Sequence, residues 1–463
     1  MLTSPIHEDA TSFSVSPAVS STTLEVGEGE VRVSVDTEVE TNIYNVHTSF
    51  SSSTKPHATS SDPCWNAMRR VQSEVSNLTL DHFRFIRKLG SGDIGSVYLV
   101  ELKGNNNKGC LFAAKVMDKE ELVSRSKEGR AGTEREILEM LDHPFLPTLY
   151  TTLDTDKWSL LLTEFCPGGD LHVLRQRLPE KRFDEAAVRF YTSEVVVALE
   201  YLHMMGIIYR DLKPENVLVR SDGHIMLTDF DLSLKCDESI VMPQLVHDDE
   251  GTSPNLDHNN SNHHSPPYNY SSSCILPNCI VPKYVSCWYS KHNRRRRRGG
   301  GRASGERPLR LIAEPIEARS TSFVGTHEYL APEIASGEGH GNAVDWWTLG
   351  IFMYELLYGV TPFRGLDNEF TLSNIVARAF EFPKEPLVPI MAKDLITQLL
   401  VKDPTMRMGS MMGATTIKQH PFFDGVNWAL LRCTTPPHVP TNFNSTRDSV
   451  SSYDNDDDYV DYY

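Results

Sequence analysis

A glycine-rich turn between two strand-like segments is the feature that most restricts how this chain can fold. Gly90, Gly92 and Gly95 fall within six residues, and the segments on both sides alternate apolar and polar residues. Glycines permit a tight turn whose backbone N–H groups approach a phosphate closely. A Rossmann unit has a similar pattern, but there the glycines open a helix, whereas here a strand containing Val97 follows. An ordinary hairpin would also contain such glycines, so this motif alone does not decide the fold.

The secondary-structure pattern changes from strands to helices along the chain. A third strand-like segment over 111–119, an amphipathic helix that stops before Pro144, and a buried strand before Pro167 complete a mostly β region. Between Asp184 and Gly206, apolar residues recur at intervals of three and four, which predicts a long helix with a glycine cap. The simplest architecture is an α+β protein with a small, mostly β lobe followed by a larger, mostly α lobe.

Composition separates this ordered region from a tail and an insertion. Residues 1–75 are rich in Ser, Thr, Val and Glu, which predicts a disordered tail, with order beginning near Leu80. Residues 237–314 are polar and basic, and we expect them to loop out as a disordered insertion. The predicted boundaries are 83–166 for the small lobe, 167–423 for the large lobe with its insertion, and 424–463 for a C-terminal extension with an acidic, aromatic tail.

Composition also excludes several classes of protein. The formal net charge of −17 argues against a nucleic-acid binder. No run of eighteen apolar residues is present in the sequence, which argues against a membrane-spanning helix. The N-terminus lacks the basic and apolar regions of a secretory signal, and the eight cysteines include no Cys-x-x-Cys pair. Both features favour a reduced, cytoplasmic protein.

Two charged residues after the glycine-rich turn favour a nucleotide site. Lys115 follows one strand later, where its ammonium would reach the α- and β-phosphates of ATP. Glu134, on the next helix, would hold this lysine by an ion pair, and the neighbouring Glu136 is its rival. Taken singly, such residues are more often solvated surface charges than ligands.

The segment YRDLKPEN, after the long helix, supplies the decisive set. Asp211 would accept the proton of a substrate hydroxyl, and Lys213 would neutralise charge on the transferred γ-phosphoryl group. Asn216 would bind Mg²⁺, and Asp229, one short strand later, would bridge the metal to the phosphates. Phosphoryl transfer depends mostly on positioning and charge stabilisation, so these parts in this order are specific although each alone is weak.

Together these residues resemble the signature of protein kinases. The resemblance covers roughly residues 83–432 and includes HEYLAPE from His327, DWWTLG from Asp345 and KDPTMR from Lys402. It implies a bilobal kinase fold, ATP and Mg²⁺ as cofactors, and protein substrates. By the same resemblance the nucleotide contacts are Leu89, Gly90, Gly92, Gly95, Val97, Lys115, Glu134, Glu164 and Cys166, with Thr163 as the gatekeeper.

The resemblance implies two further contacts around the site. Thr326 would form a hydrogen bond near Asp211 and so belong to the catalytic set. Glu333 and Arg407 would form a buried ion pair that ties the activation segment to the large lobe.

Finer features resemble the plant group VIII of AGC-type serine/threonine kinases. Tyr209 in place of the usual histidine and the segment DHPFLPTLY are typical of the AGC class. The long insertion, GTHEYLAPE and the triplet that ends in Asp231 narrow the resemblance to group VIII. It implies PIN-type auxin-efflux carriers as substrates, roles in polar auxin transport and organ development, and a phosphoinositide-dependent upstream kinase.

Asp231 departs from the glycine that most kinases have at this position. Glycine lets the preceding Asp-Phe pair change conformation at little backbone cost, whereas aspartate tolerates left-handed angles only with some penalty. We therefore expect a restricted conformational switch, with Asp229 retained as a metal ligand. The alternative interpretation is a catalytically silent, membrane-associated pseudokinase scaffold.

Two segments suggest regulation. Ser322 lies at the activation-loop phosphorylation position, with Ser320 as its rival, and a phosphate there would pair with Arg210. Near the C-terminus, Tyr459 and Tyr462 resemble an aromatic-x-x-aromatic motif that docks on the small lobe of this or the upstream kinase. A plain acidic tail is an equally good interpretation.

The insertion carries a concentrated positive charge. The segment from Lys283 to Arg310 contains ten Lys and Arg residues and a single acidic residue, Glu306. Each of these basic residues would contribute about 1 kcal/mol of attraction to an anionic leaflet. Aromatic side chains and palmitoylation of Cys287 would strengthen binding to anionic lipids. A nuclear-import signal at Arg294–Arg298 is the rival interpretation, as is a solvated loop. We expect a cytoplasmic protein that is peripheral at the inner face of the plasma membrane.

Overall fold

The computed structural model describes most of the chain between residues 62 and 440. The described residues are 62–75, 77–104, 109–236, 244–247, 309–312, 314–315 and 318–440. The chain divides into a unit formed by residues 1–242 and 313–463 and a second unit formed by residues 243–312. In the second unit, β10 (Gln244–His247) pairs antiparallel with β11 (Leu309–Ile312).

These two strands lie at the two ends of the segment that composition predicts to be a disordered insertion. Each strand has only four residues, and its partner is supplied by the other end of the insertion. Composition reports on local sequence, so a pairing between distant segments leaves no signal in it. The long stretch between the strands, including the basic run, lies outside the described residues.

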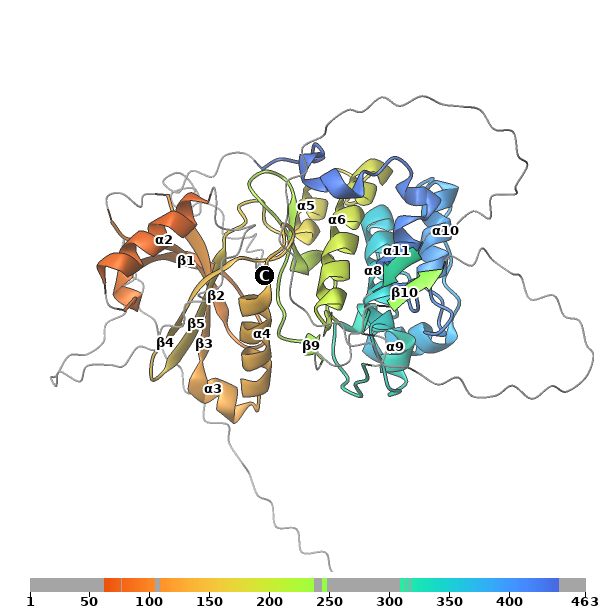
Figure 1. The fold of residues 1–463 in the computed structure, drawn as a ribbon. Coiled ribbons are helices and arrows are strands. Elements are labelled where there is room, and N and C mark those ends of the chain that lie inside the picture. The colour runs from red at the N-terminus through yellow and green to blue at the C-terminus, as the bar shows by residue number, and fades with distance from the viewer. Residues whose placement is uncertain are drawn as a thin grey trace, which may run out of the picture. The chain divides into compact units, whose positions relative to one another are not determined.

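The small lobe is built on a five-stranded antiparallel sheet with the order β1-β2-β3-β5-β4 (Figure 1). Its strands are β1 (Phe83–Ser91), β2 (Ser96–Leu102), β3 (Leu111–Asp118), β4 (Leu149–Asp154) and β5 (Trp158–Glu164). The glycine-rich turn joins β1 to β2, as the alternating pattern predicted. Two helices, α3 (Lys119–Ser124) and α4 (Glu128–Met140), follow β3. Ile137 and Leu138 of α4 are buried in the main apolar core, which fixes the helix to the lobe.

An additional helix precedes the sheet and corrects the predicted start of order near Leu80. α2 (Pro63–Glu74) is capped by Asp62, whose carboxylate accepts the backbone N–H of Cys64 at 2.8 Å. Trp65 and Met68 are buried in one apolar cluster with residues of the sheet, among them Tyr150. The average composition of the tail concealed this short amphipathic segment. The residues before position 62 lie outside those described.

The large lobe is mostly helical, as the sequence predicted. Its helices are α5 (Leu171–Arg177), α6 (Glu185–Met204), α7 (Pro332–Ala335), α8 (Ala343–Tyr358), α9 (Asn368–Ala377), α10 (Ile390–Leu399) and α11 (Ala414–Lys418). Its short strands are β6 (Ile207–Ile208), β7 (Val217–Val219), β8 (Ile225–Leu227) and β9 (Leu234–Lys235), paired β6 with β9 and β7 with β8. Every residue of α8 is buried, and α6 and α10 pack against it (Figure 1). None of the helices in the described part of the chain combines the length and apolar character that crossing a membrane requires.

Two segments near the predicted boundaries of the large lobe pack against it. Glu314, which the sequence placed in the insertion, is buried and contacts His203 Nδ1 at 2.8 Å, so it belongs to the packed lobe. After the last helix, the chain continues to Pro440 and lies against the segment between the lobes. A Cβ atom at Gly168 would meet Pro440 at 2.8 Å, so this close approach requires glycine. The predicted bilobal α+β fold is confirmed.

The contribution of α2 to stability can be measured by truncating its buried indole. Trp65 is 1% exposed, so Trp65→Ala should destabilise the protein by roughly 3–5 kcal/mol through lost burial and the cavity left behind. The midpoint of denaturant unfolding measures this change. Glu74→Ala, on the exposed side of the same helix, is the control and should change the stability by less than about 0.5 kcal/mol. Equal midpoints for the two variants would contradict the packing of α2.

Candidate active site

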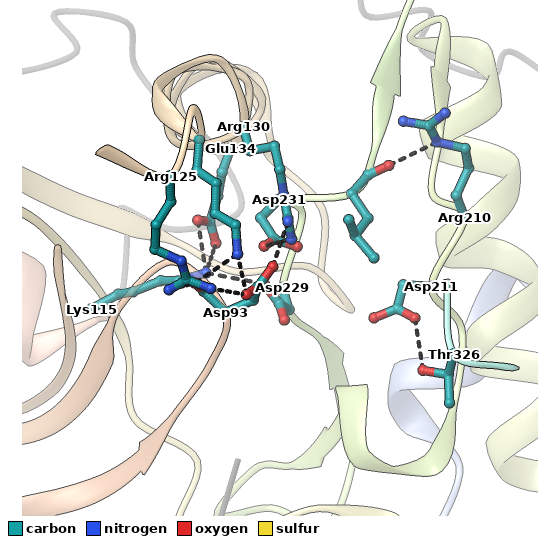
Figure 2. Close-up of polar contacts among 12 residues, drawn as sticks. Asp93, Lys115, Arg125, Arg130, Glu134, Arg210, Asp211, Asp229, Asp231 and Thr326 are labelled. Carbon is teal, nitrogen blue, oxygen red and sulfur yellow. Dashed lines mark hydrogen bonds and ion pairs between the residues drawn. The ribbon is translucent and has the colours of Figure 1, made fainter. Parts of the chain in front are cut away.

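A lysine of the small lobe joins carboxylates from two distant parts of the chain. Lys115, on β3, contacts Glu134 of α4 at 2.8 Å and Asp229 at 3.0 Å (Figure 2). The rival Glu136 instead pairs with Lys235 at 3.1 Å. The structure therefore shows the predicted pair of Lys115 with Glu134 and adds a contact of Lys115 with Asp229 that the sequence analysis did not predict.

The charges of this cluster support one another. Burial works to lower the pKa of Lys115, but the attraction of Asp229 and Glu134 outweighs it and raises the pKa, so the ammonium stays charged. Burial raises the pKa of Glu134, while Lys115 opposes that shift. Burial also works to raise the pKa of Asp229, but Lys115 lowers it below the ordinary value. A single ammonium thus keeps the prospective metal ligand ionised.

The catalytic set predicted from YRDLKPEN also converges. Asp211 contacts Lys213 at 3.0 Å and accepts a hydrogen bond from the Thr326 hydroxyl at 3.3 Å. Lys213 donates to the Thr326 oxygen at 3.0 Å, and Asn216 donates to Asp211 Oδ2 at 2.8 Å. Burial raises the pKa of Asp211, with Lys213 opposing the shift. The side chain that would accept the substrate proton is therefore held by three neighbours and poised toward proton acceptance.

The loop that carries Asp211 is held by a buried residue whose role the sequence did not reveal. Asp345, the first residue of DWWTLG, is fully buried in α8 and accepts the backbone N–H groups of Tyr209 and Arg210 at 2.8 and 2.7 Å. Arg210 has a left-handed backbone with φ +67°, which is strained for a side chain of this size. The two hydrogen bonds stabilise that conformation and so fix the direction in which Asp211 points.

The residues present fit a nucleotide with Mg²⁺. The carboxylate of Asp229 is a hard oxygen ligand of the kind Mg²⁺ prefers. Both amide hydrogens of Asn216 point at Asp211, to its backbone oxygen at 2.9 Å and its carboxylate at 2.8 Å, so a metal would meet the amide oxygen. In the glycine-rich turn, a Cβ atom on Gly95 would lie 2.5 Å from the backbone oxygen of Val116, so this position requires glycine. At Gly92, the nearest atom to such a Cβ is 4.0 Å away, which leaves open space beside the turn.

Two apolar clusters flank the segment that joins the lobes. Leu89 and Ala113 belong to a small-lobe cluster against which Val97 packs. Cys166 and Leu218 belong to another cluster, together with Met226 of β8. Leu89, Val97 and Cys166 were among the predicted nucleotide contacts, whereas Ala113, Leu218 and Met226, which pack with them, were not.

The predicted gatekeeper Thr163 and the predicted nucleotide contact Glu164 lie at the end of β5, and the contact Cys166 follows two residues later. Thr163 donates a hydrogen bond to the backbone oxygen of Ala113 at 3.4 Å. The Glu164 side chain pairs with Arg220 at 2.8 Å, which leaves its backbone as the group available to a nucleotide. Cys166 is buried, with Sγ 3.8 Å from Met226 Sδ, and burial raises the pKa of its thiol.

The activation segment places its two candidate serines differently. Arg210 Nη1 donates to Ser320 Oγ at 3.1 Å, and the backbone of Ser320 pairs with that of His340. Ser322 is exposed, and its backbone N–H bonds to Ser320 Oγ at 3.2 Å. Arg210 therefore contacts the rival serine, while Ser322 is the one open to modification.

The ion pair expected between the activation segment and the large lobe is also in place. Arg407 contacts the two carboxylate oxygens of Glu333 at 2.7 and 2.9 Å, and both side chains are buried. A bidentate pair of this kind fixes orientation as well as distance.

The unusual Asp231 does not have the backbone that the sequence analysis anticipated. Among the described residues, the non-glycine positions with positive φ are Ser126, Lys181, Arg210 and Asp229. The left-handed residue of this triplet is therefore Asp229, with φ +61°, and Asp231 bears no left-handed strain in this conformation, while the restricted switch stays a prediction. Asp231 is instead buried and bonded to Arg130 of α4, a residue that sequence reasoning missed.

Comparisons with known proteins agree with this geometry. Residues 83–297 and 312–423 match the protein kinase domain family. A protein kinase of Oryza sativa subsp. indica is 55% identical over 398 residues, which cover 85% of this chain and 66% of that protein. Serine/threonine-protein kinase AGC1-7 of Arabidopsis thaliana is 53% identical over 405 residues, which cover 86% of this chain and 70% of that protein.

A longer relative extends the comparison. Serine/threonine-protein kinase KIPK2 of Arabidopsis thaliana is 53% identical over 422 residues, covering 89% of this chain and 43% of KIPK2. This chain thus spans about two thirds of the length of the Oryza sativa relative and less than half of that of KIPK2.

The electrostatics of Asp211 predict a pH effect. Asp211 must be ionised to accept a proton, so the rate of phosphoryl transfer should fall as the pH drops through the raised pKa of Asp211. Burial raises that pKa and Lys213 holds it down, so Lys213→Met should move the acid limb of kcat/KM to higher pH while also lowering the rate. Lys235→Met removes a surface lysine that pairs with Glu136 and should leave the limb in place. An unmoved limb in Lys213→Met would contradict this electrostatic role.

Proposed function

Because this chain belongs to the protein kinase family, and its relatives place it among the plant AGC-type serine/threonine kinases, we propose that it transfers the γ-phosphate of ATP to serines of proteins. One observation carries the proposal. Lys115 is joined to both Glu134 and Asp229, while Asp211, Lys213 and Thr326 are already in mutual contact. The charged groups that phosphoryl transfer requires are thus assembled in one conformation.

Each side chain has a role in the proposed transfer. Bound ATP supplies the phosphoryl group, and Mg²⁺ stabilises charge on it. Lys115 would hold the phosphates, with Glu134 fixing its ammonium. Asp211 would orient the serine hydroxyl and accept its proton, and Lys213 would stabilise the negative charge that develops on the transferred group. Asn216 and Asp229 would hold the metal.

A charge beside the catalytic groups supports a preference in the protein substrate. Glu215, two residues from Lys213, contacts His172 Nδ1 at 3.2 Å and has a side chain that is 42% exposed. Burial works to lower the pKa of Lys213, but Asp211 and, more weakly, Glu215 raise it. A carboxylate exposed at this place favours substrates with basic residues near the serine.

Among such substrates we propose PIN-type auxin-efflux carriers. The supporting observation is sequence resemblance, since the glycine-rich turn, the triplet ending in Asp231 and the long insertion resemble those of PINOID, a group VIII kinase that phosphorylates these carriers. Roles in polar auxin transport and organ development follow from the same resemblance. A phosphoinositide-dependent kinase would act upstream on Ser322, whose exposure supports this assignment. Tyr459 and Tyr462, its proposed docking residues, lie outside the described residues.

We further propose that the protein is peripheral at the inner face of the plasma membrane. The support is the charge of the insertion between Lys283 and Arg310, which would attract anionic lipids. Apart from Leu309 and Arg310 of β11, this segment lies outside the described residues, so the proposal depends on its composition alone. A carrier substrate in the same membrane would then be close to the enzyme.

Transfer of label separates an active kinase from a silent scaffold. With labelled ATP, Mg²⁺ and either a basic serine peptide or the cytosolic loop of a PIN carrier, Asp211→Asn should lower the rate at least about a hundredfold, because the proton acceptor is lost. Asp156→Asn, an exposed Asp-to-Asn change, is the control and should keep the wild-type rate. If the wild type transferred no more label than Asp211→Asn, the chain would be a scaffold. Label on the peptide alone would remove only the carrier from the proposal.

Membrane attachment is tested by changing charge within the basic run. Changing Arg294–Arg298 to alanine removes five charges and should release a fluorescent fusion from the cell edge, because each charge contributes about 1 kcal/mol of attraction. The same five positions changed to lysine keep the charge and should keep the membrane signal. An unchanged signal in the alanine variant would exclude this segment as the anchor, and loss of nuclear signal alone would favour the import interpretation.

A further inference from the structure

One arginine connects two segments that lie far apart in the sequence. Arg130, in the first turns of α4, contacts Asp93 of the glycine-rich turn through Nη1 at 2.5 Å. Its Nη2 contacts Asp231, which follows β8 (Figure 2). We call these three residues, Asp93, Arg130 and Asp231, the arginine clasp. A planar guanidinium suits this bridge because its fork of donors can serve two carboxylates at once.

Because Asp231 is buried, its carboxylate requires a charged partner. Asp231 is 4% exposed, and a buried carboxylate without a partner is strongly unfavourable. Arg130 supplies that partner only while α4 stays close to the segment after β8. The residue that replaces the usual glycine therefore favours one position of the helix.

The clasp acts on the same helix face as the catalytic ion pair. Arg130 precedes Glu134 by four residues, so their side chains lie one turn apart on one side of α4. Glu134 holds Lys115, while Arg130 holds Asp231, two residues beyond the Asp229 that Lys115 also contacts. Arg130 thus ties α4 directly to the segment after β8, and one turn later Glu134 does so indirectly, through the Lys115 that also contacts Asp229.

The Asp93 side extends this bridge to the glycine-rich turn. Asp93 is contacted by Arg125 at 2.6 Å, by Lys127 and by Arg130. A hydrogen bond from Lys127, assisted by Arg130, lowers the pKa of Asp93 to about 2, so the carboxylate is ionised at neutral pH. Backbone mobility of a glycine-rich turn works against close phosphate binding, and this tether restricts it.

We propose that Arg130 is a positioning residue for phosphoryl transfer, which with Asp93 and Asp231 sets α4 and the glycine-rich turn in the arrangement that binds the nucleotide. The inference rests on the proposed kinase activity for its purpose, but its effect is on nucleotide binding. In this proposal Asp231 forms an ion pair that supports nucleotide binding, and aspartate in place of the usual glycine does not impair the site.

Equilibrium binding of ATP with Mg²⁺ to the full chain tests the clasp without requiring turnover. Arg130→Gln and Asp231→Asn should each weaken ATP binding roughly tenfold or more, the scale of a lost charge-assisted hydrogen bond. The double variant should be no weaker than the poorer single variant, because both changes break one interaction. Arg130→Lys should recover only part of the affinity, since an ammonium lacks the planar fork.

Arg135→Gln is the matched control on the same helix. Arg135 is 31% exposed against 29% for Arg130, and it pairs with Glu139 and Asp154, away from the clasp. This variant should bind ATP within about twofold of the wild type. Hydrogen exchange of the α4 amides should accelerate in Arg130→Gln and stay unchanged in Arg135→Gln.

The outcomes separate this inference from the proposed function. Equal affinities for the two glutamine variants, or additive losses in the double variant, would overturn the clasp. If Arg130→Gln does not fold, Asp231→Asn alone decides, because it keeps the shape of the side chain. Wild-type protein that binds ATP with an intact clasp yet transfers no label would refute the kinase proposal and leave the clasp standing.

Discussion

The buried carboxylate of Asp345 is the constraint on which the rest of the active site depends. It holds two consecutive backbone N–H groups, of Tyr209 and Arg210, in the loop that carries Asp211, the proposed proton acceptor. A left-handed residue such as Arg210 costs about 1–3 kcal/mol, and each hydrogen bond to a charged group contributes about 1.5–3 kcal/mol, so the pair offsets the strain. Because the backbone is left-handed at Arg210, the side chains of Arg210 and Asp211 point in different directions. Arg210 reaches Leu232 and the activation segment, while Asp211 faces Lys213.

That constraint reaches the end of the insertion through a buried histidine. His203 contacts Asp345 through Nε2 and Glu314 through Nδ1, each at 2.8 Å. Burial works to lower its pKa, but the two carboxylates raise it to about 10, so the imidazolium persists at neutral pH. Two buried acids next to each other would repel strongly without this cation. Through His203, Glu314 is therefore linked to Asp345, which holds the loop that contains Asp211. The chain that follows the insertion is held in place at Glu314 before the activation segment.

The sequence predicts the parts of this site better than their connections. Lys115, Asp211 and Asp229 are found because phosphoryl transfer requires these chemical groups in a known order along the chain. Local pattern does not reveal the contact of Asp345 with Tyr209 or of Arg130 with Asp231, because these contacts join residues more than a hundred positions apart and leave no periodicity. Helix α2 was not predicted for a different reason, because its few apolar residues are diluted by the polar residues of the tail. Aspartate in place of the usual glycine at position 231 suggested an effect on the backbone, whereas the structure shows an ion pair of the Asp231 side chain with Arg130.

The arrangement of charge explains how a second aspartate is tolerated beside the prospective metal ligand. Asp229 and Asp231 have separate cationic partners, Lys115 and Arg130. Burial raises the pKa of Asp231, and the charge of Asp229 adds to that shift, so an unpaired Asp231 would favour the protonated form or repel incoming phosphates. Lys115 and Arg130 both lower the pKa of Asp231 and so counter these effects, and Arg130 is the cation that contacts its carboxylate. An aspartate at this joint is therefore compatible with phosphate chemistry when an arginine occupies the helix position opposite it, and the two residues have to be judged together.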